Sequence, residues 1–303
     1  MRHPYAKTVW ALVYVFLSLC IVFPGCSLHK QENAQAGEYK DLIKSYNKDL
    51  EYKKGLEDLK NNLQQGSESI PVNQQPGLSM MKNLLKNKGS LKDIPILTYH
   101  CIDDTIFGVR EMFVSPGAFD EQMKYIKEQG YTPITFEDLD KIDSIDKPIM
   151  ITLDDGYEDN YLYAYPILKK YHFKATIFLI VNAINKPKYL KMEEISQMKD
   201  LIDFQSHTLS HPHLADLDEG KILFELAQSK RGLESLLKKK VSVIAYPYGS
   251  YNQKVIEIAK RYYRFGVTTH FGKFYVGAED NYQIKRMSVL DHTQFSSFEQ
   301  FFK

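Results

Sequence analysis

The sequence has little cysteine and no surplus of either charge, and each shortage excludes a class of protein. Only Cys20, Cys26 and Cys101 are present, which excludes a disulfide framework and a CxxC metal cage. Lys and Arg number 39 and Asp and Glu number 38, so no bulk positive charge favours a nucleic-acid partner. Apolar material is plentiful: 44% of the 303 residues are hydrophobic, enough for a sizeable core in one large domain or two smaller ones.

The N-terminus has the features of an export signal. A short basic segment precedes an apolar run from Val9 to Phe23, which is too short for a comfortable membrane span. Gly25 and Cys26 resemble the lipoprotein box of bacteria, in which the cysteine is lipidated and becomes the new N-terminus. We expect residues 1–26 to be a lipoprotein signal, with an uncleaved membrane anchor or ordinary secretion as alternatives. Each alternative places the body of the protein outside the cytoplasm, and the first two tether it to the cell membrane.

The rest of the chain divides near residue 92. Residues 27–92 carry leucines among charges at roughly helical spacing and then the stretch "GSESIPVNQQPG", so we expect a helical tether and linker. Over residues 93–303, short apolar runs alternate with amphipathic stretches, and Ser115 and Gly130 have the positions of a helix N-cap and a helix stop. This strand–helix alternation predicts an α/β domain with a parallel sheet, most simply closed as a barrel.

Polar residues gather where the predicted strands end. Tyr99–His100, Asp154–Asp155, His207 and Tyr246–Tyr248 each follow an apolar run. In parallel α/β barrels the carboxyl ends of the strands share one face, and active sites are built there. We therefore expect these residues to converge, although an Asp-Gly turn that only terminates a strand would also explain "LDDG".

The residues at these strand ends are suited to a metal site. His207 and His211 are four residues apart, a spacing that can aim two imidazoles at one ion, although surface histidines on a loop would also show it. An aspartate from another strand end would complete a His-His-Asp set with an open position for water. The adjacent Asp154 and Asp155 would allow one carboxylate to bind the metal and the other to accept a proton.

Three motifs in a fixed order resemble a known family. The stretches "TLDDG", "SHTLSH" and "AYPYG" are similar to motifs of the polysaccharide deacetylase family, carbohydrate esterase family 4 with its NodB homology domain. The resemblance covers residues 94 to about 290. In addition, "LTYHCI" resembles the start of the poly-N-acetylglucosamine deacetylase branch, in which the motif order is circularly permuted. Together with the strand–helix alternation, the resemblance implies an α/β fold of the distorted (β/α)7-barrel type.

The resemblance also implies a role for the motif residues. Asp155, His207 and His211 would bind a divalent metal, usually Zn2+, with Co2+ or Ni2+ as alternatives. Asp154 would be the general base for the attacking water, and the backbone N–H of Tyr248 would stabilise the tetrahedral oxyanion.

The acid that protonates the leaving amine has two candidates. By resemblance to the permuted branch it is His100, which also lies at a predicted strand end. The stretch "VLDH" resembles a late Leu-x-His element of the common family form, so His292 is the rival acid and Leu290 a candidate substrate contact. His213, in "HPH", is treated as a bystander.

The sequence departs from the common family form in two places. Ala245 stands where that form has an arginine that orients the catalytic aspartate, and the Asp-Trp element that usually follows is not visible. An orienting cation must therefore come from elsewhere, or neighbouring groups alone must hold the aspartate. Both losses occur in the exopolysaccharide branch, so they bear more on the substrate than on the activity.

These features predict a metal-dependent hydrolase that removes N-acetyl groups from N-acetylglucosamine residues of a cell-surface polysaccharide, either exopolysaccharide or peptidoglycan, and releases acetate. The alternative is a catalytically weak or inactive relative that binds glycan in envelope or matrix assembly, which the missing arginine favours. An unrelated secreted metal hydrolase such as a phosphoesterase would need a second cluster of ligands, which the sequence does not show.

Overall fold

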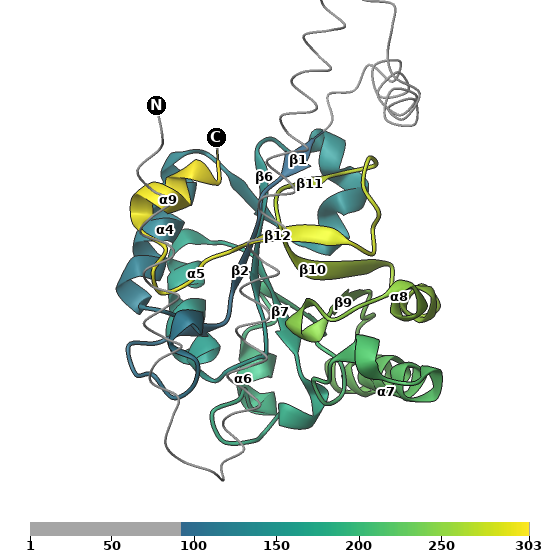
Figure 1. Cartoon of the computed structure of the whole chain (residues 1–303). Coiled ribbons are helices and arrows are strands. Elements are labelled where there is room, and N and C mark those ends of the chain that lie inside the picture. The colour runs from purple at the N-terminus through teal and green to yellow at the C-terminus, as the bar shows by residue number, and fades with distance from the viewer. Residues whose placement is uncertain (1–91, 303) are drawn as a thin grey trace, which may run out of the picture. The chain divides into compact units, whose positions relative to one another are not determined.

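Seven parallel strands close into a ring in the computed structural model, which describes residues 92–302 (Figure 1). Around the ring they are β2 (Ile96–Tyr99), β12 (Ile284–Ser288), β10 (Phe265–Phe271), β9 (Val243–Ala245), β8 (Ile202–Ser206), β7 (Ala175–Leu179) and β6 (Pro148–Leu153). Strand β6 pairs with β2 to close the ring, and β5 (Thr132–Ile134) lies outside it, paired with the start of β6. The predicted α/β barrel of the distorted (β/α)7 type is confirmed.

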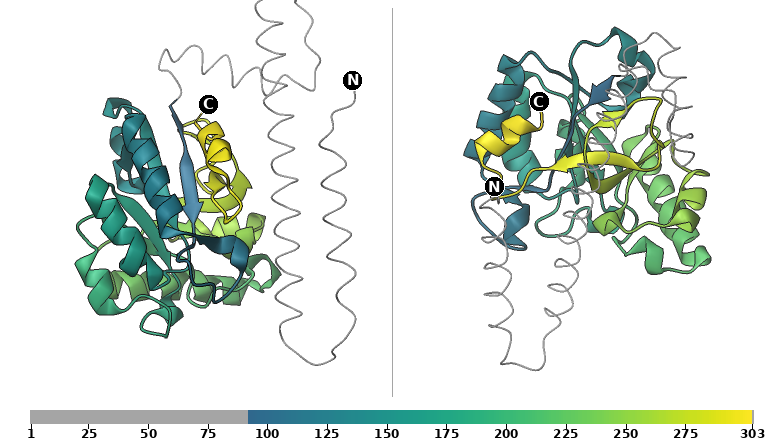
Figure 2. Two further views of the ribbon diagram at one scale, coloured as in Figure 1. Left: turned by 90° about the vertical axis from the view of Figure 1, so that its left-hand side faces the viewer. Right: turned by 45° about the horizontal axis from the view of Figure 1, so that its top comes forward.

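Helices cover the outside of this ring (Figures 1 and 2). The α-helices are α4 (Pro116–Glu128), α5 (Tyr165–Tyr171), α6 (Met192–Gln197), α7 (Glu219–Leu237), α8 (Gln253–Ala259) and α9 (Phe295–Gln300). The other helical segments, of 3-10 or π type, are η2 (Arg110–Met112), η3 (Phe136–Ser144), η4 (Asn160–Ala164), η5 (Val181–Ala183), η6 (Leu214–Asp216) and η7 (Pro247–Gly249). Two small pairs, β1 (Asp93–Ile94) with β11 (Phe274–Tyr275) and β3 (Cys101–Ile102) with β4 (Phe113–Val114), complete the fold.

Local sequence signals set the ends of the longer helices. The Ser115 hydroxyl accepts a hydrogen bond from the Ala118 N–H at 3.1 Å, as expected of an N-cap before α4. Gly130 follows the same helix with φ of 72°, a left-handed conformation that glycine adopts without steric cost. Asp218 caps α7 by accepting from the Lys221 N–H at 2.9 Å. The sequence predictions for Ser115 and Gly130 are confirmed.

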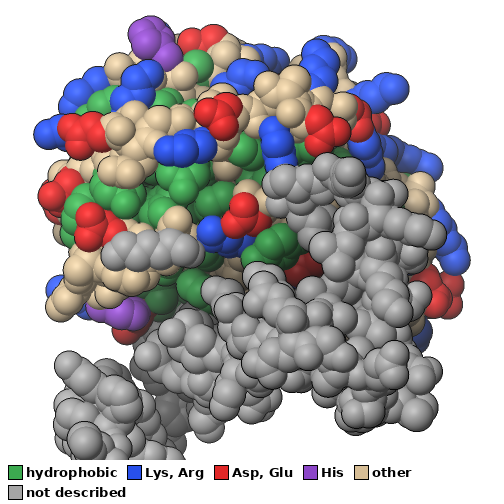
Figure 3. Space-filling view, turned by 90° about the horizontal axis from the view of Figure 1, so that it is seen from above, with side chains coloured by type: hydrophobic (Ala, Val, Ile, Leu, Met, Phe, Trp, Pro, Cys, Tyr) green, Lys and Arg blue, Asp and Glu red, His purple; other side chains and the backbone are tan. Residues whose placement is uncertain are grey.

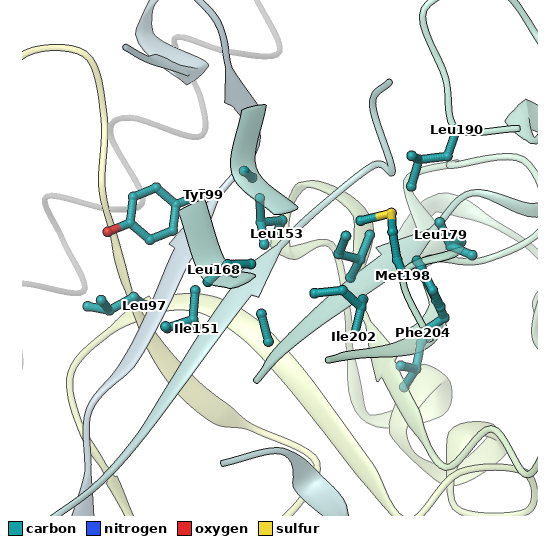
Figure 4. Packing of buried hydrophobic residues seen from close by; sticks show 14 of the residues in the cluster. Leu97, Tyr99, Ile151, Leu153, Leu168, Leu179, Leu190, Met198, Ile202 and Phe204 are labelled. Carbon is teal, nitrogen blue, oxygen red and sulfur yellow. The ribbon is translucent and has the colours of Figure 1, made fainter. Parts of the chain in front are cut away.

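The strands alternate between an outer and an inner apolar cluster. Outward-facing residues such as Leu97, Ile151 and Phe204 pack against the covering helices in one large buried cluster (Figure 4). A second buried cluster includes Met150 and Phe178, the alternate positions of the same strands, and fills the inside of the barrel. Because side chains alternate along a strand, every second residue of β6 points into the barrel.

Strand register aligns the ends of neighbouring strands. Tyr99 pairs with Leu153, so His100 and Asp154 are each the first residue beyond their strand. The Asp154 N–H donates to the Tyr99 carbonyl at 2.9 Å, which extends the pairing one step further. Ser206 of β8 ends its strand in the same way, and His207 follows it. The strands of a parallel ring therefore deliver these polar residues to one edge.

The predictions for the N-terminal part of the chain are not addressed by this structure. The signal or anchor at 1–26, the lipid-attachment residue Cys26 and the tether at 27–92, apart from Lys92, lie outside the described residues. Among residues 92–302, no helix has both the length and the apolar character needed to cross a membrane.

Figure 3 shows the end of the molecule near β1 and β11. An apolar band crosses the visible part of this face, and lysine, arginine, aspartate and glutamate side chains are interspersed around it. Charges of both signs thus border the band, and neither sign forms a separate region on the visible surface.

Gly266 in β10 is a position at which the packing of the barrel can be tested. A Cβ atom there would lie 2.2 Å from the hydroxyl oxygen of Tyr246, a side chain that is 1% exposed and has no room to move away. We predict that Gly266→Ala lowers the free energy of unfolding by about 1–3 kcal/mol, as overpacking does in cores. Urea denaturation would measure this change in the free energy of unfolding.

Gly117→Ala is the matched control. Gly117 lies in α4 with nothing within 4 Å of an added Cβ, so alanine should be neutral or slightly stabilising there. Equal losses of stability in the two variants would contradict the packing argument.

Candidate active site

The Asp-Asp-Gly stretch is a tight turn, and the carboxylates of Asp154 and Asp155 point in different directions from it. Asp155 and Gly156 are both left-handed, with φ of 71° and 72°, and the Gly156 N–H donates to the Asp154 carbonyl at 2.9 Å. Left-handed backbone is unfavourable for aspartate, so Asp155 is held there by its surroundings. The positive φ favours glycine at position 156, and an added Cβ would also lie 2.6 Å from Leu179 Cδ2, which would have to shift. The turn thus separates the carboxylate of Asp154 from that of Asp155.

Asp155 faces the two histidines expected at the metal site. Its Oδ1 lies 3.4 Å from His207 Nε2 and 3.2 Å from His211 Nε2, and the two nitrogens lie 3.1 Å apart. Asp155 Oδ1 is buried, yet it has no hydrogen-bond partner of acceptable geometry among the described residues. A carboxylate oxygen and two imidazole nitrogens, all within 4.8 Å of one another, form a donor set that suits a tetrahedral divalent cation with an open position. The residues present therefore fit a metal ion.

Surrounding groups fix the two imidazoles. His207 Nδ1 lies 2.9 Å from the Ala245 carbonyl, so it carries the proton and leaves the lone pair of Nε2 directed at Asp155. For His211 it is the backbone that is fixed, since its main-chain N–H donates to the Thr208 hydroxyl at 2.9 Å. Burial lowers the pKa of His211 below the ordinary value, which favours the neutral ligand form. Burial opposes ionisation of Asp155 too, but its contacts with both histidines outweigh it and hold the pKa of that carboxyl well below its usual range.

Asp154 points into the barrel and is held by an arginine that sequence reasoning did not identify. Arg286, on β12, donates from Nη1 to Oδ1 at 2.8 Å and from Nη2 to Oδ2 at 2.7 Å. The two side chains are 1% and 4% exposed. Arg286 also donates to the Thr152 hydroxyl and the Thr268 carbonyl, each at 3.1 Å, which fixes the guanidinium from two further sides. This is the orienting cation that Ala245 does not supply.

The electrostatics of Asp154 follow from this pair. Burial raises the pKa of the Asp154 carboxyl, but the charge of Arg286 and its two hydrogen bonds outweigh burial and hold the pKa below its usual value. Asp154 is therefore an ionised carboxylate at neutral pH, fixed in orientation beside the histidine pair. Each of its oxygens retains a further lone pair with which to accept a proton.

The two candidate acids have different environments. His100 follows β2, its carbonyl accepts from Asn160 Nδ2 at 2.9 Å, and its Nδ1 is buried without a partner among the described residues. Because Tyr99 pairs with Leu153, strand register places His100 next to Asp154 at the same edge of the barrel. The His292 side chain is 57% exposed and its Nδ1 lies 2.9 Å from Asp291.

Leu290, the partner of His292 in the predicted Leu-x-His pair, lines a separate cavity. Leu290 is half-buried and lines a cavity of about 220 Å³ together with Gln122 and Asp291. Neither residue of the predicted Leu-x-His pair has a recorded contact with Asp154, Asp155 or the two metal-site histidines within residues 92–302.

Tyr248 lies against the histidine pair. Its backbone is left-handed, with φ of 58°, and its ring is edge-on to His211 with centroids 4.5 Å apart. His213 stacks on the other side of Tyr248, with centroids 4.0 Å apart and an interplanar angle of 13°. His213 was treated as a bystander from sequence, but it supports the ring beside a metal-site histidine. The "HPH" stretch, which puts His213 two residues after His211, was the sequence signal for this contact.

The fold and the site can now be compared with known proteins. The features compared are an α/β barrel, a candidate Asp-His-His cation site and a carboxylate held by an arginine at one edge. A family model described as polysaccharide deacetylase matches residues 141–265. A solved structure, the Streptococcus pyogenes deacetylase PplD in complex with acetate, is 31% identical, covers 71% of this chain and 100% of its own, and superposes with a TM-score of 0.66. The chain belongs to the polysaccharide deacetylase family, whose members are hydrolases acting on amide bonds.

Two further relatives match over part of their length. The Bacillus subtilis polysaccharide deacetylase homologue YxkH is 35% identical over 186 residues, which is 59% of this chain and 65% of that protein. The poly-beta-1,6-N-acetyl-D-glucosamine N-deacetylase of Staphylococcus aureus is 27% identical over 172 residues, 50% of this chain and 59% of that enzyme. The chain thus spans about three fifths of the length of these two relatives.

The buried Arg286–Asp154 pair leads to a prediction for stability. Arg286→Met would leave Asp154 buried and uncompensated, so we predict a loss of about 3–5 kcal/mol in the free energy of unfolding at neutral pH. Because the pKa of Asp154 is lowered in the folded state, the contribution is present above its unfolded pKa and is lost as pH falls through the folded pKa. Urea denaturation at several pH values would measure both.

Arg264→Met is the matched control, because Arg264 makes a bidentate salt bridge with Asp140 on the exposed surface. Exposed pairs contribute little, so its loss should be about 0–1 kcal/mol. A similar cost for both substitutions would contradict the assignment of Arg286 as the cation on which Asp154 depends.

Proposed function

We propose that this protein is a metal-dependent N-deacetylase that hydrolyses the N-acetyl group of N-acetylglucosamine residues in a cell-surface polysaccharide and releases acetate. The observation that carries the proposal is the division of two adjacent carboxylates, with Asp154 bound to Arg286 and Asp155 facing His207 and His211. A protein that only binds glycan has no need of this separation. Membership of a deacetylase family supports the same reaction.

Asp155, His207 and His211 would hold the cation, with Zn2+ preferred for its affinity for mixed imidazole and carboxylate ligands and Co2+ or Ni2+ as alternatives. When bound, the ion would supply Lewis-acid polarisation of the acetamide carbonyl and of water. Asp154 would accept the proton of the attacking water, because it is ionised at neutral pH and fixed beside the cation centre. Arg286 keeps that carboxylate in one orientation without taking part in the proton transfer.

The remaining steps are assigned to Tyr248 and His100. The backbone N–H of Tyr248 would stabilise the oxyanion of the tetrahedral intermediate, since its residue lies against His211. His100 would donate a proton to the leaving amine. Its position at the end of β2, beside Asp154 in the strand register, supports this choice over the exposed His292.

The substrate class and the location are part of the same proposal. Similarity to the Staphylococcus aureus poly-beta-1,6-N-acetyl-D-glucosamine N-deacetylase favours a polymer of N-acetylglucosamine, either an exopolysaccharide or peptidoglycan. A lipid on Cys26, or an uncleaved anchor, would tether the enzyme outside the cytoplasm next to such an immobile polymer, and secretion is the alternative. The inactive glycan-binding alternative depended on the missing arginine, and Arg286 removes that argument.

The activity can be tested by acetate release. We predict that the purified protein, stripped with a chelator and reloaded with Zn2+, releases acetate from N-acetylglucosamine oligomers. Asp154→Asn should reduce kcat by about 10²–10⁴, the usual contribution of a general base. Asp140→Asn, which also removes a carboxylate charge from an arginine partner but at the surface, should leave kcat unchanged. Binding of metal and oligosaccharide without acetate release would favour the glycan-binding alternative.

The two candidate acids can be separated by a pair of substitutions. We predict that His100→Gln lowers kcat by about 10²–10⁴, because the amine would leave without a proton donor, while His292→Gln leaves it near the wild-type value. Steady-state acetate release at neutral pH measures both. The opposite pattern would assign the acid to His292.

A further inference from the structure

One carboxylate outside the barrel accepts three hydrogen bonds from the loop that carries the two histidines. Glu225, on α7, accepts hydrogen bonds at its Oε2 from the backbone N–H groups of Leu209 and Ser210, each at 3.0 Å. Its Oε1 accepts from the Ser210 hydroxyl at 2.5 Å. The three donors belong to the loop between His207 and His211, so a helix side chain binds the middle of the ligand loop.

Glu225 is an unusual residue for such a position. It is 8% exposed, and no lysine, arginine or histidine pairs with it among the described residues. A buried carboxylate is unfavourable unless its charge is compensated. Here the two N–H groups and the hydroxyl of the loop provide that compensation through hydrogen bonds. The carboxylate and the loop therefore depend on each other.

The loop needs an external restraint because its backbone is strained. Thr208 and His211 are both left-handed, with φ of 67° and 62°, which β-branched and bulky residues rarely adopt. The ends of the loop are held by short internal bonds, from the Thr208 N–H to the Ser206 hydroxyl and from the His211 N–H to the Thr208 hydroxyl. Between them, the N–H groups of Leu209 and Ser210 donate to Glu225. The carbonyls of Thr208 and Leu209 accept from the N–H groups of Val181 and Asn182 at 3.2 and 2.9 Å, so Glu225 restrains the donor side of the loop.

The two histidines differ in how far they depend on this restraint. His207 directly follows β8 and its ring is bound to the Ala245 carbonyl. His211 lies at the far end of the loop, and its side chain is 19% exposed. Its approach to Asp155 therefore depends on the conformation of residues 208–210.

We propose that Glu225 is a positioning residue that holds His211 in place for the divalent cation and thereby sets the affinity of the centre. The inference rests on the proposed cation site, and it goes beyond the reaction by assigning metal affinity to a residue on the outer helix. Groups of this kind, one shell away from a metal, typically change its affinity by 10–100-fold.

The test measures zinc affinity without substrate. For the purified full chain, the dissociation constant for Zn2+ would be obtained by competition with a chromophoric chelator, and folding of the metal-free protein by circular dichroism. Glu225→Ala is expected to bind Zn2+ about 10–100-fold more weakly while remaining folded. Glu225→Gln retains an oxygen that can accept from the two N–H groups, so it should restore most of the affinity.

Glu234→Ala is the matched control on the same helix. Glu234 accepts from the Val241 N–H at 3.0 Å and pairs with Lys230, and it has no contact with the histidine loop. Its loss should lower the thermal midpoint of the metal-free protein and leave zinc affinity unchanged. If Glu225→Ala does not fold, Glu225→Asp replaces it, because withdrawing the carboxylate by one methylene should still weaken zinc binding.

The outcomes separate this inference from the proposed function. Wild-type affinity in folded Glu225→Ala or Glu225→Asp, or an equal loss in Glu234→Ala, would overturn the positioning role alone. Glutamine that binds as weakly as alanine would overturn its hydrogen-bonding basis. Failure of the wild-type protein to bind any of Zn2+, Co2+ and Ni2+ would overturn the metal centre and with it the proposed deacetylase.

Discussion

The buried pair between Arg286 and Asp154 is the interaction on which the rest of the site depends. Neither charge could remain inside the barrel alone, because each would lose its hydration without compensation. Their two hydrogen bonds join β12 to the end of β6 through the interior and fix Asp154 at the edge of the ring. Asp154 is bound by Arg286, and the left-handed turn at Asp155 directs the next carboxylate toward the histidines of the candidate cation site.

The cation centre is in turn a product of strained backbone held by its surroundings. Asp155, Thr208 and His211 all have positive φ, and each lies in a loop that follows a barrel strand. A neighbouring strand supplies the Ala245 carbonyl for His207, and an outer helix supplies Glu225 for the loop before His211. Rigid strands and a packed helix thus position short loops that carry the chemistry, which is the usual arrangement in parallel α/β barrels.

The features that have local or periodic signals could be predicted from the sequence. Strand–helix alternation predicted the barrel, and strand ends predicted that His100, Asp154 and His207 would lie at one edge. Arg286 was missed because its partner is 132 residues away, and nothing in "IKRMS" reveals which buried carboxylate it meets. Glu225 was missed because a glutamate on an amphipathic helix ordinarily faces solvent. Contacts of this kind depend on how elements pack, which periodicity does not specify.

The division between the two carboxylates is tested most directly by diffraction from crystals of the purified protein soaked in Zn2+, with anomalous data at the zinc edge. The account predicts one zinc within about 2.0–2.2 Å of one oxygen of Asp155 and of the Nε2 atoms of His207 and His211. Asp154 should keep both hydrogen bonds to Arg286. A zinc ion bound by Asp154, with Arg286 released from it, would contradict the account.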